Sequence, residues 1–562
     1  MFKALVHLVP GSNKIRLEYM PPGPAPSSVH TLASTNSSWF NINYLPQLNA
    51  PPLHLAIVLG NDVDYRKTMS GGSELDIVIR KFRLAAYLCQ AFTGEQMHRY
   101  NFGRRCFRYE EEWQPGTLSE RDVNSAPMRS EAKIHIVRCD KTVAQLRSLS
   151  HSSSNKNALY QVVKDSVKRN LDLQPGQKHY VLAMLLDNDW GADIETSLRH
   201  AAVGSDDEDG VRMAMFCSHR LHAYPSYIEE VERVLTEHGP VNGESARNCG
   251  SEGLSNWETA TLGLGSNLRE YGRVFGCPEG GTGIMGSDYI PFNRTFTEWE
   301  RYSNRPDAQS PPGCTKADEA SWSRLEALRF RIHPCFRLPS DGPVSDDPIQ
   351  VWPVGNGRLL IISASGVAFV EIFVDNNNNE EQKGIIEYVN ASSGNIPKHI
   401  SLTEQGVRHY LAENYKKSKK LKLAIHAGNF RPYVIEDFVE LTKSKESIVR
   451  LPKGQVGFKG PRIGSSRGVE STQEELVLQC IAPSTKLLVS IKLYLDTFVT
   501  GIEFCYEDST SQIFGKKAAE HFKREFVLGK PDPCLFSNIV RLVTSVFAFQ
   551  IFDGVKLLRD FT

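Results

Sequence analysis

The sequence of 562 residues contains no long hydrophobic run. The longest apolar stretches, such as residues 546–552, fall far short of the roughly 20 residues that a membrane-spanning helix needs. The apolar run at the N-terminus stops at Pro10 and Gly11, and no small-residue cleavage site follows it. We therefore expect no signal peptide, no membrane partner, and a location in the cytoplasm or the nucleus.

The sequence also lacks a net charge and closely spaced cysteine pairs. Lys and Arg together number 65, and Asp and Glu together number 65. Without an overall positive charge, the chain is not expected to bind nucleic acid. The 11 cysteines are scattered, and none stands in a CxxC pair. In a reducing compartment such cysteines are expected to be free thiols in or near hydrophobic cores.

The chain is long enough for about three or four domains. Residues 1–52 are rich in Pro, Ser and Asn, and we expect a linker or an irregular cover there. After them, short apolar runs alternate with segments of helical periodicity. The predicted strands are 53–60, 133–137, 179–186 and 211–217, and the predicted helices are 74–92, 158–171 and 227–238. This alternation predicts an α/β or α+β domain over residues 53–340.

The pattern changes near residue 340, where short apolar runs separated by Gly and Asn begin. These runs predict an all-β, sandwich-like domain over residues 341–445. A segment rich in Lys, Gly, Pro and Ser, residues 444–468, marks another boundary. The predicted strands beyond it are 475–481, 486–494, 499–506 and 547–558. We therefore expect a separate β domain over residues 446–562.

The most informative stretch lies between residues 257 and 285. A helix starting near Trp257 places Arg269 and Arg273 one turn apart on the same face. Gly276 ends that helix, and the turn after it brings Glu279 to the same side. Met285 follows after a Gly-rich bend.

This layout resembles the zinc-peptidase pattern HExxHxxGxxH with a methionine turn. In that pattern three His bind zinc and the Glu is the general base. Glu270 stands at the general-base position and Met285 at the methionine turn, whereas the ligand positions are Arg269, Arg273 and Glu279. A guanidinium stays protonated and offers a metal no lone pair. We therefore expect no bound metal at this site and an inactive Glu270.

Several longer blocks resemble the zinc metallopeptidase family of yeasts and moulds. They are the segments around 83–93, 107–113, 275–296, 328–339 and 349–353. The resemblance covers roughly residues 50–430. It implies a zincin-like fold for the first domain and a zinc cofactor in active relatives, with no cofactor expected in this chain.

The C-terminal segment resembles jacalin-like lectins, which are β-prisms. Residues 499–508 and 512–516 resemble one hairpin of that fold, and 549–555 resemble its last strand. The resemblance implies a sugar-binding loop of GxxxD type. Here Asp553 keeps the carboxylate, but Phe549 replaces the glycine and would crowd the loop. Asp553 is therefore the candidate sugar-binding residue.

Other candidate residues surround the degenerate zinc motif. His219 and His222 are three residues apart and could form an alternative metal site, although loop histidines are the simpler interpretation. Cys277 could be a thiol nucleophile, but its motif holds no His base. His333 is interpreted as a hydrogen-bonded core or cap residue. A further hypothesis is that Glu270 and Glu279 pair with the two arginines, so that an ion-pair cluster replaces zinc.

Three functions remain open from the sequence. The first is a pseudopeptidase that binds a peptide, a protein or a glycan. The second is an active zinc metalloendopeptidase with non-standard ligands, such as His219 or Glu279. The third is a jacalin-type lectin for which the N-terminal part is a scaffold.

Overall fold

The computed structural model describes most of the chain up to residue 445 and parts of the remainder. The described residues are 3–19, 36–46, 48–63, 74–150, 158–173, 176–186, 210–240, 254–300, 314–355, 357–376, 379–389, 396–445, 448–450, 456–458, 488–495, 499–517 and 523–527. The chain divides into two compact units, the first of which comprises mainly Met1–Gly342, while the second begins at Pro343. None of the described helices is long and apolar enough to cross a membrane.

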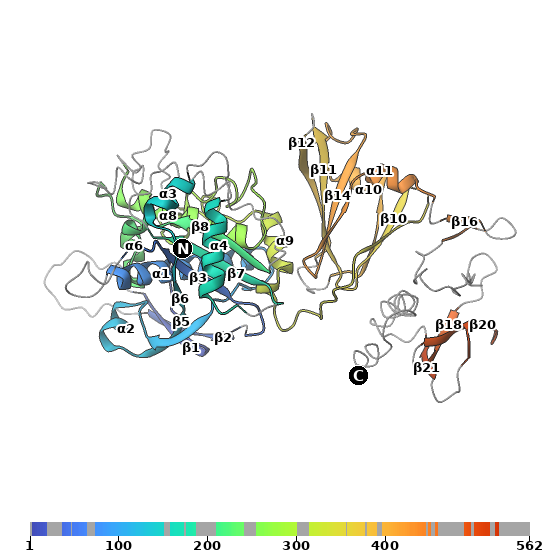
Figure 1. Ribbon diagram of the computed structural model, residues 1–562, viewed down its shortest axis with the longest axis horizontal. Helices are drawn as coiled ribbons and strands as arrows, with labels where there is room; N and C mark the ends of the chain where they lie inside the picture. The colour runs from blue at the N-terminus through green and yellow to red at the C-terminus, as the bar shows by residue number, and fades with distance from the viewer. Residues whose placement is uncertain are drawn as a thin grey trace. The chain divides into compact units, whose positions relative to one another are not determined.

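A parallel four-stranded sheet forms the centre of the first unit (Figure 1). In spatial order its strands are β6 (Ile134–Arg138), β3 (Leu53–Leu59), β7 (His179–Leu185) and β8 (Val211–Cys217). Each strand begins within one residue of its predicted start. Such continuous apolar runs are typical of parallel strands buried on both faces.

Helices cover both faces of this sheet. The helices α3 (Val143–Ser150) and α4 (Ala158–Asn170) pack on one face, where their apolar side chains share a core with β3, β6, β7 and β8. On the other face α8 (Asn256–Val274) contacts β7 and β8. Phe82 of α1 (Glu74–Arg99) packs edge-on against Phe216 of β8.

Two helix predictions need correction. The helix α1 runs to Arg99 rather than to residue 92, because Gln96 and Met97 are also buried. Ser73, which the sequence suggests as the N-cap of this helix, lies outside the described residues. The segment predicted as one helix over 227–238 forms only η2 (Ile228–Glu230) and α6 (Val231–Val234). Val231, Val234 and Leu235 are buried, but the residues from Thr236 to Pro240 add no further apolar side chain that could extend the helix.

The N-terminal segment is more regular than we expected. The strands β1 (Gly11–Tyr19) and β2 (Asn36–Tyr44) form an antiparallel pair in which Ile15 lies opposite Phe40. Polar and apolar residues alternate along β1, which is the period of a half-buried strand. The Pro-rich run 21–28, which suggested a linker, lies outside the described residues.

Shorter elements complete the first unit. They are β4 (Glu111–Pro115), α2 (Glu120–Ser125), β5 (Met128–Ala132), η1 (Leu221–Ala223), η3 (Phe292–Thr295), α9 (Arg324–Ile332) and η4 (Pro334–Phe336). The helix α9 starts at a capping box, in which Ser323 and Glu326 satisfy each other's backbone N–H groups. This box matters for the site because Glu326 also reaches Met285.

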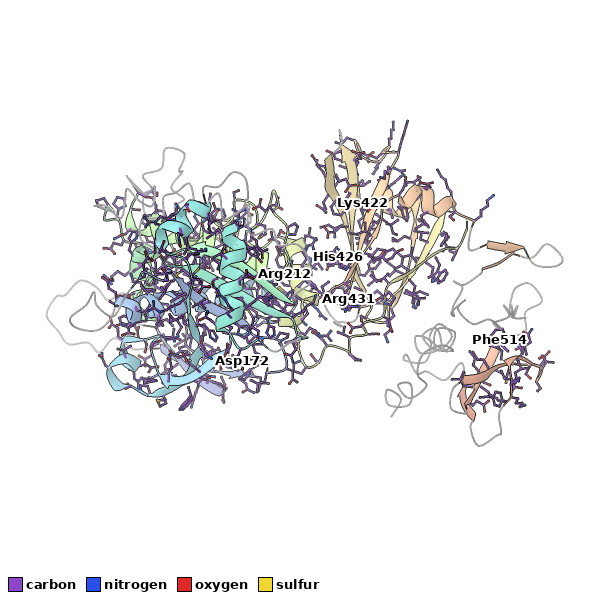
Figure 2. The ribbon with its side chains drawn as sticks, in the orientation of Figure 1. Asp172, Arg212, Lys422, His426, Arg431 and Phe514 are labelled. Atoms are coloured by element: carbon purple, nitrogen blue, oxygen red, sulfur yellow. The ribbon has the colours of Figure 1, made fainter. Side chains whose placement is uncertain are left out.

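The second unit contains two sheets that share one apolar core. The first has the order β13 (His399–Thr403), β10 (Arg358–Ile362), β9 (Gln350–Pro353), and the second β12 (Asn379–Glu387), β11 (Val367–Asn376), β14 (Leu421–Ala427), β15 (Pro432–Ile435). Two short helices, α10 (Glu404–His409) and α11 (Phe438–Lys443), accompany them. Figure 2 labels His426 on β14, whose ring stacks on Phe369 and whose Nε2 lies 2.7 Å from Glu371.

The described part of the C-terminal segment is entirely β-structure. The strands β16 (Ile448–Arg450) and β17 (Val456–Phe458) pair with each other. Four antiparallel strands form a further sheet in the order β20 (Ser511–Gly515), β19 (Val499–Tyr506), β18 (Leu488–Leu495), β21 (Lys523–Val527). The predicted strands 475–481 and 547–558 lie outside the described residues.

Taken together, the two units make this a mixed α/β, multidomain protein that contains several sheets.

Candidate functional site: the degenerate metal motif on helix α8

The helix α8 carries the motif through the interior of the first unit. It begins at a capping box, in which the Ser255 backbone N–H donates to Glu258 Oε2 at 2.9 Å. It ends next to Gly276, whose φ of +84° suits glycine. Nearly all of its residues are buried. A buried, capped helix of this length holds its last two turns, and therefore the motif, in a fixed position.

Arg273 lies at the centre of an ion-pair cluster. Its Nη1 donates to Glu270 Oε1, and its Nη2 donates to Glu279 Oε1. The side chains of Arg273 and Glu270 are only 5% and 8% exposed, whereas that of Glu279 is 47% exposed. Burial lowers the pKa of Arg273, but the charge of Glu270 and the hydrogen bonds to both carboxylates outweigh it and raise that pKa above its usual value. Arg273 is therefore a permanent cation.

Arg269 connects the helix to the segment that contains Met285. Its Nη2 donates to the backbone carbonyl of Met285 at 3.0 Å and lies 3.9 Å from Glu279 Oε1. Its guanidinium carbon lies 5.2 Å from the ring centroid of Tyr289, within cation–π range. Arg269 thus fixes the position of the turn after the helix.

These side chains do not fit a zinc ion. Zinc in peptidase sites takes three protein ligands with free lone pairs and a water. Two of the three ligand positions here hold guanidiniums, which have none, and the third, Glu279, is engaged by Arg273. Two fixed positive charges within this cluster would also repel a dication. The structure brings Arg269, Glu270, Arg273, Glu279 and Met285 together as the motif predicts.

Glu270 also lines a small cavity. Its lining also includes Asn267 of α8, His219 and Arg220 after β8, and Tyr224 beyond η1. Its volume of about 20 Å³ has room for an ordered water but not for a peptide side chain.

Of the alternative site residues, His219 lines the same cavity as Glu270, and His222 lies in the short helix η1 that follows it. His222 is exposed, and its Nδ1 lies 3.1 Å from the His219 carbonyl oxygen. Among the described residues, neither histidine belongs to a group of three metal-ligand side chains. Cys277 is buried at the end of α8. Asp553 and Phe549 lie outside the described residues.

His333 is the N-cap of η4 and is completely buried. Its Nδ1 accepts from the backbone N–H of Cys335 at 3.1 Å. Burial first, and then the charges of Arg212 and Lys178, hold its pKa well below the usual value. His333 is therefore a neutral cap.

The sequence interpretation overlooked Glu326. Its Oε1 accepts from the Met285 backbone N–H at 3.3 Å, and its Oε2 accepts from the Ser323 backbone N–H at 2.6 Å. Burial raises the pKa of Glu326 to about 7, although the hydrogen bonds to Ser323 and Met285 oppose that rise. The signal in the sequence was the Ser-x-x-Glu capping box; its link to Met285 is tertiary.

The sequence interpretation also overlooked a three-residue group of metal-ligand side chains. Within the described parts of the chain, His54, Glu110 and His135 alone form such a group. They share no local motif, because 56 residues separate the first two and 25 separate the last two.

Comparison with known proteins identifies the family. A family model described as "Putative peptidase family" matches residues 1–368, well over half of the chain. The chain belongs to this metallopeptidase family.

Two relatives extend the match beyond the first unit. A protein of Saccharomyces cerevisiae named "Putative zinc metalloproteinase" is 30% identical over 543 residues, which cover 90% of this chain and 73% of the relative. A protein of Schizosaccharomyces pombe with the same designation is 30% identical over 525 residues, covering 92% of this chain and 79% of the relative.

Solved structures give a weaker likeness. Two crystal structures of OgpA from Akkermansia muciniphila, one wild type and one catalytically inactive with an O-glycopeptide substrate, have TM-scores of 0.36 and 0.35 at 12% identity. They cover 69% of this chain and 91% and 92% of OgpA. Superpositions with such low TM-scores do not pair individual residues, so no site residue is transferred from OgpA.

Proposed function

We propose that this member of the peptidase family is a pseudopeptidase. The motif scaffold is kept, the zinc is lost, and the protein acts by binding a peptide, a protein or a glycan. The observation that carries the proposal is the pair of contacts from Arg273 to Glu270 and Glu279. A general base must be free to take a proton from a metal-bound water. Glu270 instead accepts from a permanent cation.

The ion-pair cluster also supplies a reason why the scaffold survives without metal. In the zinc pattern, the ion ties the helix to the turn after it. Here Arg273 ties Glu270 on α8 to Glu279 beyond it, and Arg269 ties α8 to Met285. The arginines therefore provide the cross-links that a metal would otherwise provide.

For the domains we propose a zincin-like first unit, a β-sandwich-like region over residues 341–445 and a jacalin-like region over 446–562. The two sheets that share a core support the second assignment. The antiparallel sheet of β18 to β21 is compatible with the third. A glycan ligand would belong to this last region, and its test is whether Asp553→Ala abolishes binding on a glycan array.

The decisive experiment measures zinc per chain after restoring the histidines. The variant with Arg269→His, Arg273→His and Glu279→His should bind one zinc more than the wild type. A matched control with Gln at the same three positions removes the same charges without adding imidazoles, and it should bind no additional zinc. Circular dichroism establishes that each variant is folded.

Peptidase activity provides the second readout. With zinc supplied, the wild type should not cleave fluorogenic peptide libraries above the rate of a Glu270→Gln variant. The proposal would be overturned if the wild type cleaved peptides in a zinc-dependent way and the Glu270→Gln variant did not. That result would favour an active zinc peptidase. A folded triple-His variant that gains no zinc would show that the geometry is not that of a decayed zinc site.

A further inference from the structure

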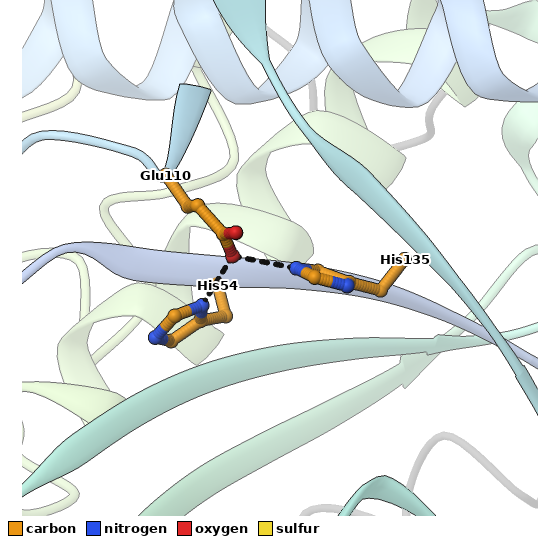
Figure 3. Close-up of side chains that lie close together, drawn as sticks. All are labelled: His54, Glu110 and His135. Atoms are coloured by element: carbon orange, nitrogen blue, oxygen red, sulfur yellow. Dashed lines mark hydrogen bonds and ion pairs between the residues drawn. The ribbon is translucent and has the colours of Figure 1, made fainter. Parts of the chain in front are cut away.

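A second cluster of metal-ligand side chains lies at the amino-terminal edge of the parallel sheet (Figure 3). Glu110 Oε2 lies 2.7 Å from His54 Nδ1 and 2.6 Å from His135 Nε2. The three side chains are partly accessible, with exposed fractions of 12% for His54, 28% for Glu110 and 15% for His135. None of these residues belongs to the motif on α8.

The strand register places the two histidines on one face. In the parallel pairing of β3 with β6, His135 lies opposite Ala56, two residues after His54. Side chains two residues apart on a strand point to the same face, so both imidazoles emerge on the same side of the sheet. The rings lie 6.0 Å apart between centroids.

Backbone hydrogen bonds hold Glu110 between these strands. Its N–H donates to the Leu53 carbonyl at 3.2 Å, and its carbonyl accepts from the Lys133 N–H at 2.8 Å. The residues that carry these groups stand immediately before His54 and two before His135. Each of the three candidate ligands therefore sits on backbone that is fixed relative to the other two.

We propose that His54 Nδ1, His135 Nε2 and the Glu110 carboxylate form a binding site for Zn²⁺. Two imidazoles and one carboxylate form a ligand set that zinc accepts, leaving a fourth position for solvent. Imidazole also suits the other late first-row divalent ions. Mg²⁺ and Ca²⁺ prefer oxygen ligands and should bind poorly.

The distances are compatible with a metal after a small movement. The three ligand atoms lie within 4.8 Å of one another. Around a tetrahedral zinc with bonds of about 2.1 Å, ligand atoms lie roughly 3.4 Å apart. Glu110 Oε2 must therefore retreat by less than about 1 Å from each nitrogen, which a carboxylate achieves by side-chain rotation. The two nitrogens, which lie within 4.8 Å of each other, must approach by at most about 1.4 Å. The metal would replace the protons that the imidazoles now share with that oxygen.

Glu110 is surrounded by groups that favour negative charge, because both imidazoles and an ammonium group contact its carboxylate. The nearest competing cation is Lys133, whose Nζ lies 3.0 Å from Glu110 Oε1. Its positive charge should weaken metal binding, because it would remain close to the dication.

The test is a zinc titration of the full-length, chelator-treated and dialysed protein by calorimetry, with Co²⁺ absorption as a second probe. The wild type should bind one Zn²⁺, and His54→Ala, His135→Ala and Glu110→Gln should each weaken binding by more than the roughly 10–100-fold cost of losing an outer-shell partner. The exposed His222→Ala is the matched control and should bind like the wild type. Lys133→Met should bind roughly three- to tenfold tighter.

The outcomes separate this site from the motif on α8. The inference would be overturned if all three ligand variants bound zinc as tightly as the wild type, or if the wild type bound no zinc at a 100-fold excess. Neither result would affect the pseudopeptidase proposal. If circular dichroism shows that a ligand variant is unfolded, the Lys133→Met variant still tests the proposal. Zinc binding by Lys133→Met that is unchanged or weaker than that of the wild type would contradict a metal at Glu110. The triple-His experiment above counts only the zinc gained over the wild type.

Discussion

At the scale of single residues, the replacement of imidazole by guanidinium decides the chemistry of the α8 motif. An imidazole can donate a lone pair to a metal, whereas a guanidinium can only donate hydrogen bonds. Arg273 accordingly makes two charge-assisted contacts with carboxylates of its own motif. One residue therefore holds both acidic side chains of the motif.

Replacing Arg273 with Ala should destabilise the protein strongly. The substitution leaves the buried Glu270 carboxylate, whose side chain is 8% exposed, without its cationic partner. Removing one partner of such a buried ion pair lowers the free energy of unfolding by about 3–5 kcal/mol. The measurement is the free energy of unfolding of the chain from urea denaturation.

Arg233→Ala is the matched control for that measurement. Arg233 also pairs with a glutamate three residues earlier, Glu230, but its side chain is 66% exposed. The loss of this surface pair should cost less than about 1 kcal/mol. Equal losses from the two substitutions would contradict a stabilising role for the buried cluster.

Glu326 gives the stability a defined pH dependence. Its pKa in the folded chain is about 7 because of burial, whereas an unfolded Glu titrates near 4.3. Between these values the folded chain holds a proton that the unfolded chain has released. The free energy of unfolding should therefore fall as the pH rises from about 5 to 7, by roughly 2–3 kcal/mol, and should level off above that.

The Glu326→Gln variant removes this dependence, because an amide does not titrate. Relative to the wild type, the variant should gain roughly 2–3 kcal/mol between pH 5 and pH 8. Urea denaturation of both proteins at several pH values measures the difference. A difference that stays constant with pH would show that Glu326 is ionised in the folded chain throughout.

At the scale of elements, the packing of helix α8 depends on glycines, although glycine has a low helix propensity. A Cβ at position 263 would approach Tyr224 Cε1 to 2.6 Å, and one at 265 would overlap the backbone oxygen of Tyr289. One at 272 would overlap Met285 Sδ. Each glycine costs the isolated helix up to about 1 kcal/mol relative to Ala. They allow the segments around the motif to contact the helix backbone directly.

Gly265→Ala should therefore destabilise the protein by about 1–3 kcal/mol, despite the better helix propensity of Ala, because a backbone oxygen cannot move aside cheaply. Gly94→Ala in α1 is the matched helical control. The nearest atom to a Cβ there is Cys106 Cβ at 3.9 Å, so this change should stabilise by up to about 1 kcal/mol. Thermal denaturation compares the two, and a stabilised Gly265→Ala would rule out the close approach.

At the scale of the whole molecule, the chain consists of two compact units with separate apolar cores. One core of the first unit lies between the parallel sheet and helices α3 and α4, and α8 packs on the other face of that sheet. The core of the second unit lies among strands of the two sheets that β9 to β15 form. Chains with several such cores commonly depart from two-state unfolding.

Scanning calorimetry should therefore resolve at least two transitions. Ile57→Ala in β3 and Ile425→Ala in β14 both truncate fully buried side chains, and each should cost about 2–5 kcal/mol. Each substitution should lower the midpoint of a different transition. A single transition that shifts with both substitutions would show that the two units unfold together.

Much of the first unit could be predicted from the sequence, because its signals are local. Continuous apolar runs identified the strands β3, β6, β7 and β8, and helical periodicity identified α4 and α8. The strands β4 and β5 were not predicted. The predicted end of α1 and the single helix predicted over 227–238 were wrong. The length of a helix depends on which partners its side chains contact after folding. The sugar-binding role of Asp553 and the crowding of its loop by Phe549 remain predictions.

The residue types alone show that two of the usual ligand positions of the α8 motif offer zinc no lone pair, since this property of Arg269 and Arg273 does not depend on their surroundings. The fold was needed to show that Arg273 contacts Glu270, that Glu326 reaches Met285, and that His54 and His135 meet at Glu110. These contacts join residues whose distance in space is set by strand order, register and burial. No spacing along the chain encodes them, because the free energy that brings them together comes from packing the whole core.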